Sequence, residues 1–236
     1  DGKGMGIESE VPFGSTLDFP KEELRLIHLD FGGIPNGYGW VFPKREGLSI
    51  GIGGMFRNGV KMNPRRHFVT FLKGLRYITD EKEVMKVVGH PLPSFYNEGQ
   101  RVSKGRVLLV GDAAHLMDPL TGEGIYYALR SGMMAAEAIL QSKEKGVSPS
   151  DPYQTAVHDH IFENLKWALR FSSFVFRFTK LAYRTLKRYP ELGNHYVRVL
   201  EGKETYQGFV ISVKERIRDF LKGRLTERMG RAIAGA

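Results

Sequence analysis

The chain has 236 residues, of which 42% are hydrophobic and 26% are charged, so it has enough apolar material for a packed core and wholesale disorder is excluded. The absence of cysteine excludes disulfides, thiolate catalysis and cysteine-ligated metals, and no apolar run approaches the roughly 18 residues that span a bilayer. The formal net charge of +9 indicates an anionic partner, such as a lipid headgroup, a phosphorylated substrate or nucleic acid.

The glycine-rich first part of the chain predicts a mainly antiparallel sheet. Short apolar runs that are typical of strands occupy residues 6–11, 24–31, 37–42 and 48–54, and a further strand is expected over 84–88. Before that last strand, Asn63 and Pro64 open an amphipathic helix.

A strand, a glycine loop and a helix follow in residues 106–141. Val107 to Val110 are continuously apolar, which predicts a strand buried on both faces. Gly111 lets the chain turn, and Asp112 then lies at the carboxyl end of the strand, where open α/β sheets bind ligands. The helix is expected to begin at about Glu123, and its first N–H groups and positive dipole end favour an anion or an electron-rich ring.

Two interpretations of this strand–loop–helix unit are open. In the first, the glycines serve only turns and helix packing. In the second, which the combination of features favours, the small loop residues let a flat cofactor approach the start of the helix. The Asp112 carboxylate would then accept hydrogen bonds from the hydroxyls of a ribose or ribityl chain.

Residues 151–236 have few glycines, carry 16 basic against 9 acidic side chains, and predict long helices. A single helix over 161–184 would gather two stripes, one basic (Lys166, Arg170, Arg177 and Arg184) and one aromatic (Trp167, Phe171, Phe174 and Phe178). Such a surface can meet an anionic membrane, which would make the protein peripheral on that membrane. The favoured interpretation is instead a solvated basic face beside a buried aromatic face.

Several other functions lack the motifs they need. No RNP, helix-turn-helix or zinc signature is present, so nucleic acid is not an expected partner. No Gly-x-Ser-x-Gly elbow and no metal-ligand spacing is present, so neither a hydrolase nor a metal site is predicted. The first residues do not have the pattern of a signal peptide, so the expected location is cytoplasmic.

Two segments resemble one protein family. GDAAHLMDPLTGEGIYYALRSG, residues 111–132, closely resembles the second FAD motif of the geranylgeranyl reductase family, within the flavoprotein group built like p-hydroxybenzoate hydroxylase. GYGWVFPKREGLSIGIGG, residues 37–54, is similar to the aromatic-x-Trp-x-Phe-Pro signature of that family and to the strand after it. The pair, in this order and at this distance, points to the prenyl reductases more narrowly than the Gly-Asp motif alone, which many flavin monooxygenases share.

The resemblance implies FAD as the cofactor. Asp112 would bind sugar or ribityl hydroxyls, and Gly111 beside it would be a further cofactor-binding residue. The residues along the flavin would be Pro119, Thr121, Gly122, Glu123, Gly124 and Ile125. Tyr38, Trp40 and Phe42 alternate along a strand and therefore share one face. In the family this region borders the cavity that holds the prenyl chain beside the flavin. Ordinary sheet core explains these three aromatic residues equally well, and both interpretations can hold together.

The sequence also departs from the family pattern. No GxGxxG strand–turn–helix for the ADP half of FAD is present, so the chain resembles the C-terminal part of the family's architecture. A missing N-terminal portion or a second chain would supply the rest. Glu123 stands where many members carry glycine, which favours the helix dipole but places a carboxylate beside an anionic flavin.

The expected fold class is α+β, or α/β by family. It comprises a substrate-domain sheet with its connecting helix in residues 1–104, an FAD-binding strand–loop–helix in 105–150, and a helical region in 151–236. The expected function is FAD-dependent reduction of C=C bonds in a geranylgeranyl or related prenyl lipid, with no catalytic residue and no electron donor assigned. The alternatives are a flavin monooxygenase or a relative of electron-transfer flavoprotein:quinone oxidoreductase, and a catalytically incomplete fragment that binds lipid or a partner.

Overall fold

The computed structural model describes residues 2–13, 20, 22, 25–56, 62–75 and 86–219. The chain divides into two compact units, Asp1–Arg177 (unit 1) and Phe178–Ala236 (unit 2). Unit 1 combines an antiparallel sheet with helices, and the described part of unit 2 is helical, so the predicted α+β class is confirmed.

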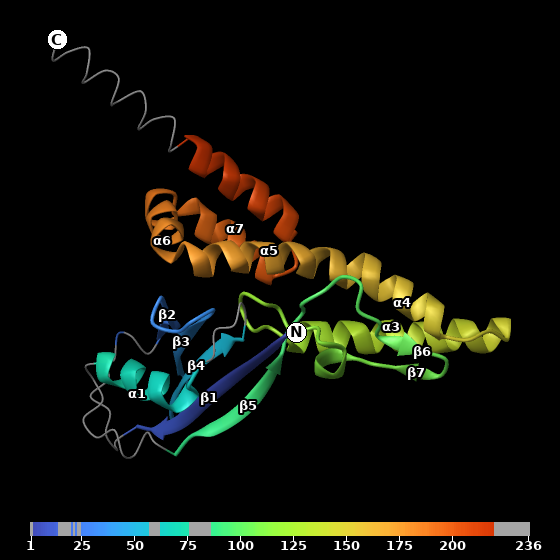
Figure 1. Cartoon of the computed structure of the whole chain (residues 1–236), viewed down its shortest axis with the longest axis horizontal. Helices are drawn as coiled ribbons and strands as arrows, with labels where there is room; N and C mark the ends of the chain where they lie inside the picture. The colour runs from blue at the N-terminus through green and yellow to red at the C-terminus, as the bar shows by residue number, and fades with distance from the viewer. Residues whose placement is uncertain are drawn as a thin grey trace, which may run out of the picture. The chain divides into compact units, whose positions relative to one another are not determined.

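A five-stranded antiparallel sheet forms the first half of unit 1 (Figure 1). Its strands are β1 (Lys3–Pro12), β2 (His28–Phe31), β3 (Gly37–Pro43), β4 (Gly47–Met55) and β5 (Val88–Pro93), in the order β2-β3-β4-β1-β5. The predicted strands over 6–11, 37–42 and 48–54 are therefore confirmed. The strand predicted over 24–31 is shorter and begins at His28, while residues 84 and 85 of the last predicted strand lie outside the described residues.

Helix α1 (Pro64–Gly74) covers one face of this sheet (Figure 1). It begins as the sequence predicts, because the Asn63 side chain accepts a hydrogen bond from the Arg66 backbone N–H at 3.0 Å and Pro64 occupies the first turn. Phe68 is fully buried and packs with the apolar residues of β3 and β4, such as Val41 and Ile50. These contacts make the first hydrophobic core of unit 1.

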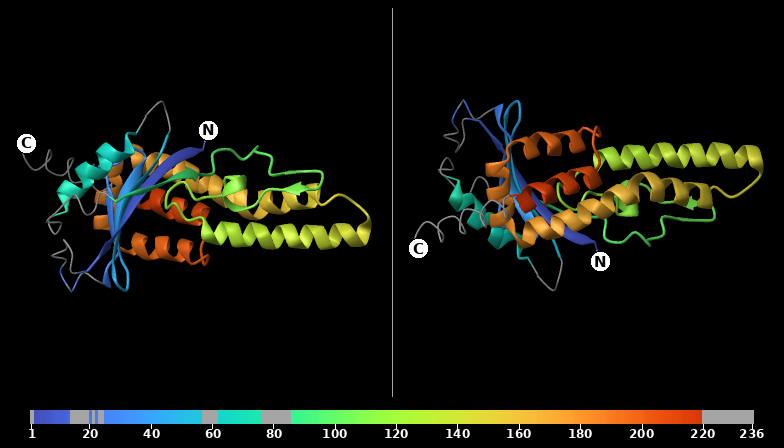
Figure 2. Two further views of the ribbon diagram at one scale, coloured as in Figure 1. Left: turned by 90° about the horizontal axis from the view of Figure 1, so that it is seen from below. Right: turned by 90° about the horizontal axis from the view of Figure 1, so that it is seen from above.

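The second half of unit 1 is mainly helical and contains one short hairpin. Its elements are β6 (Ser103–Lys104), β7 (Val107–Leu108), the 3-10 turn η2 (Gly111–Ala114), α3 (Ile125–Lys145), α4 (Ser150–Val157), the π-helical turn η3 (His158–Phe162) and α5 (Glu163–Arg177). Both views in Figure 2 show α3 lying alongside α4. The predicted helix is thus confirmed, but it begins at Ile125 rather than Glu123.

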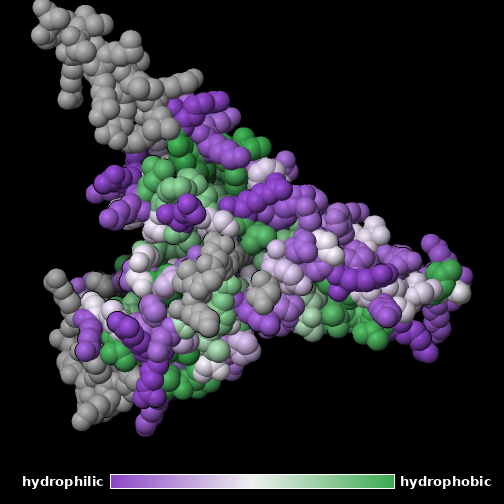
Figure 3. Space-filling model, in the orientation of Figure 1, coloured by the Kyte–Doolittle hydropathy of each residue, from purple (hydrophilic) through white to green (hydrophobic). Residues whose placement is uncertain are grey.

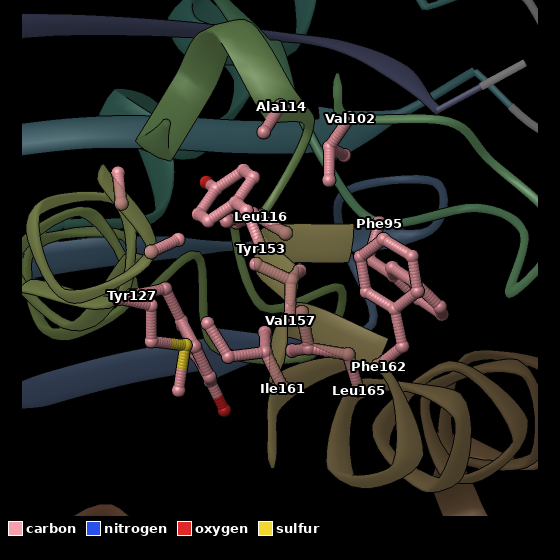
Figure 4. Packing of buried hydrophobic residues seen from close by; sticks show 13 residues of the cluster. Phe95, Val102, Ala114, Leu116, Tyr127, Tyr153, Val157, Ile161, Phe162 and Leu165 are labelled. Carbon is pink, nitrogen blue, oxygen red and sulfur yellow. The ribbon is translucent and has the colours of Figure 1, made fainter. Parts of the chain in front are cut away.

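A second core joins these helices (Figure 4). Tyr127 and Met134 of α3 pack in one buried cluster with Val157, Ile161 and Leu165 of the following helices. Because α4 and α5 complete this core, residues 151–177 belong with unit 1 and do not separate near residues 148–152, where the change in composition predicted a boundary.

The prediction of a buried strand over Val107–Val110 is wrong. β7 contains only Val107 and Leu108, and it pairs with the two residues of β6 in a short antiparallel hairpin. The Val107 side chain is 60% exposed, and Leu109 and Val110 are also exposed. Among the described residues no strand other than β6 pairs with β7, and only Leu108 of this apolar segment packs partly against the second core.

The prediction of one helix over residues 161–184 is also wrong. The backbone of Phe178, with φ −125° and ψ 43°, leaves the helical region between α5 and α6 (Thr179–Arg188). Aromatic and β-branched residues, which lose side-chain freedom in a helix, surround this break. Arg184 therefore lies in a separate helix from Lys166, whose ammonium pairs with the Glu98 carboxylate at 2.9 Å.

Unit 2 continues with α7 (Glu191–Leu200) and a further helical stretch over residues 206–219. Within the described ranges, no helix of either unit is both long enough and apolar enough to cross a membrane.

Candidate functional site

The three predicted aromatic residues of β3 line the sheet face opposite α1. Tyr38 and Trp40 meet edge to face with ring centroids 6.0 Å apart, and Trp40 stacks on Phe42 at 5.9 Å. All three side chains are half-buried, whereas Val41 on the other face is fully buried in the core beneath α1. The aromatic row is therefore a partly open surface and not the interior of the sheet.

Two glycines of β4 form the floor beneath this row. Gly53 pairs with Tyr38 and Gly51 pairs with Trp40 in the β3–β4 register. A Cβ atom on Gly51 would lie 2.2 Å from Cζ2 of Trp40, so only glycine lets the indole lie on the strand. The sequence signal for this floor was the glycine at alternate positions of β4, opposite the aromatic residues of β3.

Polar and aliphatic side chains extend the same face toward β1 and β5. The Trp40 Nε1–H donates to Ser49 Oγ at 3.4 Å, and Ser49 Oγ donates to the Glu8 carboxylate at 3.0 Å. From β5, the Leu92 side chain approaches Gly53, where an added Cβ would lie 3.4 Å from Leu92 Cδ1. Sequence reasoning missed Glu8 and Leu92, because their place beside Trp40 depends on strand order.

The turn at Gly111 fits tightly against α3. Gly111 has φ +53°, and an added Cβ would lie 2.9 Å from the Ala128 Cβ. Its backbone N–H donates to Ser131 Oγ at 3.1 Å. Both left-handed geometry and close approach therefore require glycine here, and Ser131, absent from the predicted site, fixes the turn.

A buried aspartate organises the loop before α3. Asp118 is 2% exposed, and its carboxylate accepts hydrogen bonds from the backbone N–H groups of Leu120 at 2.7 Å and Thr121 at 3.0 Å. Pro119 is also buried. This is an Asx-type turn, which the Asp-Pro pair in the sequence signals, although Asp118 was not among the predicted site residues.

The chain is partly exposed at the start of α3, where a glycine is the N-cap. Gly124 is its N-cap and makes no side-chain cap hydrogen bond, while the Glu123 carboxylate accepts a hydrogen bond from the Tyr126 backbone N–H at 2.8 Å. The exposed Asp112 carboxylate lies close by, 3.7 Å from where a Gly124 Cβ would be. The first N–H groups of any helix lack intrahelical acceptors, so backbone donors and the Asp112 acceptor lie together around Gly124.

The aromatic face and the loop meet at one hydrogen bond. The Tyr38 hydroxyl donates to the backbone carbonyl oxygen of Thr121, and it would lie 3.4 Å from a Cβ on Gly122, whose φ is +74°. Burial, together with the Asp118 and Glu123 carboxylates, raises the pKa of Tyr38 to about 12 and keeps the phenol a donor.

The contact of Tyr38 with the loop connects the predicted residues, but the two ends of the candidate site lie far apart. Tyr38 touches the loop, while Phe42 lies four residues further along β3, about 13 Å away at strand spacing. At the other end, the Ile125 side chain is 76% exposed at the first position of α3. An exposed carboxylate, the start of a helix, a left-handed glycine and an aromatic wall suit a flat, hydroxylated, electron-rich cofactor beside an apolar chain.

Comparison with known proteins identifies the class of this domain. Residues 92–159, which include the turn at Gly111, the loop and α3, match the family described as FAD binding domain. The turn, the loop and the start of α3 around Gly124 therefore lie in the part of the chain that is similar to FAD binding domains.

The relatives identify the group within that class. The chain is 32% identical over 181 residues to an uncharacterized protein of Methanosarcina barkeri, covering 76% of this chain and 45% of that protein. It is 35% identical over 129 residues to the chloroplastic geranylgeranyl diphosphate reductase of Arabidopsis thaliana, covering 53% of this chain and 26% of that enzyme. The chain is homologous to the geranylgeranyl reductases, which confirms the resemblance of its two motifs.

One solved protein structure has a fold similar to that of this chain. A geranylgeranyl bacteriochlorophyll reductase-like protein of Thermoplasma acidophilum superposes with a TM-score of 0.62 over 74% of this chain and 43% of that protein, at 22% identity. At that identity the match supports the fold alone. This chain spans less than half the length of each of these relatives.

Proposed function

We propose that this chain supplies the flavin-ring side and the substrate wall of an FAD-dependent reductase acting on C=C bonds of a geranylgeranyl or related prenyl lipid. The observation that carries the proposal is the Tyr38–Thr121 hydrogen bond, which sets the aromatic face directly beside the loop of the FAD binding domain. The homology to geranylgeranyl reductases supports it, and a monooxygenase is not favoured.

In this proposal each part of the site has a separate task. Asp112 accepts hydrogen bonds from ribityl or ribose hydroxyls, and the backbone of Gly122, Glu123, Gly124 and Ile125 lies along the ring, with Gly111, Pro119 and Thr121 fixing the loop. When bound, reduced FAD would supply a hydride to one carbon of the alkene, and a proton from solvent or a nearby acid would complete the reduction at the other carbon. The N–H groups at the start of α3 stabilise negative charge on the ring.

The substrate wall acts by position and by exclusion of water. An isolated C=C bond has no carbonyl that an acid could polarise, so orientation and a dry surface are what the protein can offer. Tyr38, Trp40 and Phe42 provide an apolar row that starts at the loop and extends along β3, long enough for several isoprene units. Gly51 and Gly53 keep this row flat against the sheet.

The ADP half of FAD needs residues beyond those described. We assign its binding to a further portion of the protein or a second chain, since the curated relatives are more than twice as long as the matched segment. The exposed side chains of Val107, Leu109 and Val110, and those of Ile125 and Leu129 on α3, are the apolar surface against which that portion would pack. The assignment of separate tasks to residues 1–104, 105–150 and 151–236 remains our functional proposal, and it differs from the structural division, which falls after Arg177.

A lipid substrate also places the protein at a membrane surface. The net charge of +9 favours an anionic one, and we propose peripheral association with it. The electron donor is unassigned.

The test begins with the visible spectrum of the purified chain after FAD is added and the excess removed. Retained flavin absorbance that is lost in Asp112→Ala but kept in Asp151→Ala, which removes an exposed carboxylate at the start of α4, supports the proposed loop. Equal retention in all three proteins contradicts it, and retention in none shows that flavin binding requires the further portion. The flavin-loaded chain, reduced with dithionite, should then add hydrogen to a geranylgeranyl lipid, as detected by mass spectrometry.

A further inference from the structure

Among the described helices of unit 2, α6 is the most uniformly basic. It carries four cations, Lys180, Arg184, Lys187 and Arg188, and no acidic residue. Among the described residues none of these four makes an ion pair, whereas other cations of unit 2 do, such as Arg216 with Glu191. Unpaired cations on one helix indicate a surface that meets an external anion.

Apolar side chains lie exposed between these cations. Tyr183 is 66% exposed and Leu186 is 47% exposed, three residues apart and therefore neighbours on the surface of α6. In a soluble unit, exposed aromatic and aliphatic groups beside unpaired cations are the composition of a helix that lies in a membrane interface.

The apolar surface continues across α7. An added Cβ on Gly193 would lie 3.8 Å from Leu186 Cδ1, so the two helices approach each other there. Val197, 51% exposed, and Leu200, 52% exposed, follow Gly193 at spacings of four and three residues on the same side of α7. Tyr183, Leu186, Val197 and Leu200 form what we term the α6–α7 patch, and Figure 3 shows apolar surface beside hydrophilic surface over these helices.

We infer that the α6–α7 patch docks unit 2 on an anionic lipid bilayer, with the patch side chains in the interface and the cations of α6 at the headgroups. The inference rests on the proposed function, in which the substrate is a lipid, and it moves the membrane surface from the predicted 161–184 helix to α6 and α7. In α5, Lys166 is held by Glu98 and Glu163. A second copy of the chain is a poorer occupant, because it would bring like charges together.

The experiment is co-sedimentation of the full chain with phosphatidylcholine vesicles, with and without phosphatidylglycerol. The wild type should bind the anionic vesicles and bind neutral ones much less, and added salt should weaken the binding. Lys180→Gln/Lys187→Gln should lower the partition coefficient about 30-fold, since each cation near the surface contributes independently. Lys143→Gln/Lys145→Gln, two exposed lysines at the end of α3 with the same change in net charge, should bind as the wild type does.

Three results would overturn the inference. They are no preference of the wild type for anionic vesicles, equal loss of binding in both double variants, and self-association without vesicles that Tyr183→Ser abolishes. Flavin retention by the same proteins is scored separately, because it reports on unit 1. A chain that retains flavin but does not bind vesicles refutes the docking surface alone. A chain that binds vesicles, and whose Asp112→Ala variant retains as much flavin as the wild type, refutes the proposed flavin site alone.

Discussion

The Tyr38 hydroxyl donates a hydrogen bond to the backbone carbonyl of Thr121, 83 residues further along the chain. This contact joins the sheet, which presents the aromatic row, to the loop that leads into α3. The two segments that resemble geranylgeranyl reductases are thus in direct contact. In the proposed function, this one phenol sets the distance between a prenyl chain on the sheet and a flavin ring on the loop.

Replacing that phenol tests the connection. Tyr38→Phe leaves the Thr121 carbonyl without its donor and should lower the free energy of unfolding by about 1 kcal/mol. Retention of added FAD should fall as well, because the loop loses its anchor to the sheet. Denaturant unfolding and flavin absorbance measure the two effects. The matched control is Tyr183→Phe, an exposed tyrosine in unit 2, and a Tyr38→Phe protein that behaves like this control would contradict the proposed role.

The same hydroxyl makes stability depend on high pH. Burial and the nearby carboxylates of Asp118 and Glu123 raise the pKa of Tyr38 from 10.0 to about 12. The fold favours the neutral phenol, so its contribution to stability is complete below pH 10 and is lost as the pH rises toward 12. The free energy of unfolding should therefore fall across this window, and less steeply in Tyr38→Phe. Tyr153, whose pKa burial also raises to about 12, should preserve part of the slope; identical slopes in the two proteins would refute the assignment.

Local sequence patterns predicted the sheet and its helix well, because alternation and capping are local properties. Asn63 and Pro64 start α1 as expected, and the strand boundaries around Tyr38 and Ser49 are close to those observed. The continuous apolar run at Val107 was misread, since a strand is buried only if neighbouring strands exist. The helix break at Phe178 was missed because no glycine or proline marks it.

The candidate site was predicted in its parts and not in its connections. The loop residues and the aromatic row were identified from two motifs, but the contact between Tyr38 and Thr121 depends on tertiary folding. The role of Asp118 in the turn could have been predicted from the Asp-Pro pair in the sequence. The positions of Glu8 and Leu92 could not, because only the order β4-β1-β5 brings them beside the aromatic row.

The glycine floor predicts a steric effect. Gly51→Ala should displace the Trp40 indole, from which the new methyl would be 2.2 Å away, and should destabilise the chain by about 1–3 kcal/mol. Trp40 fluorescence, measured with Trp167 replaced by Phe, should shift as the ring leaves the sheet. Gly132→Ala is the control, since nothing lies within 4 Å of its added Cβ in α3, and it should stabilise the helix by up to about 1 kcal/mol. Unchanged Trp40 emission in Gly51→Ala would show that the ring does not depend on this glycine.

The charge of Glu123 should affect the reduction potential of a bound flavin, and this effect can be measured separately from the role of Glu123 as a cap of α3. Its carboxylate caps α3 through the Tyr126 N–H at 2.8 Å and also places a negative charge at the proposed ring site. Glu123→Gln keeps an acceptor oxygen for the cap, so the free energy of unfolding should fall by less than about 1 kcal/mol, the share due to the helix dipole. Removal of the charge should favour the reduced, more negative flavin, and the reduction potential of the flavin-loaded chain should rise. Glu137→Gln, an exposed substitution further along α3, should leave the potential unchanged, and equal potentials in both variants would place the flavin ring away from the start of α3.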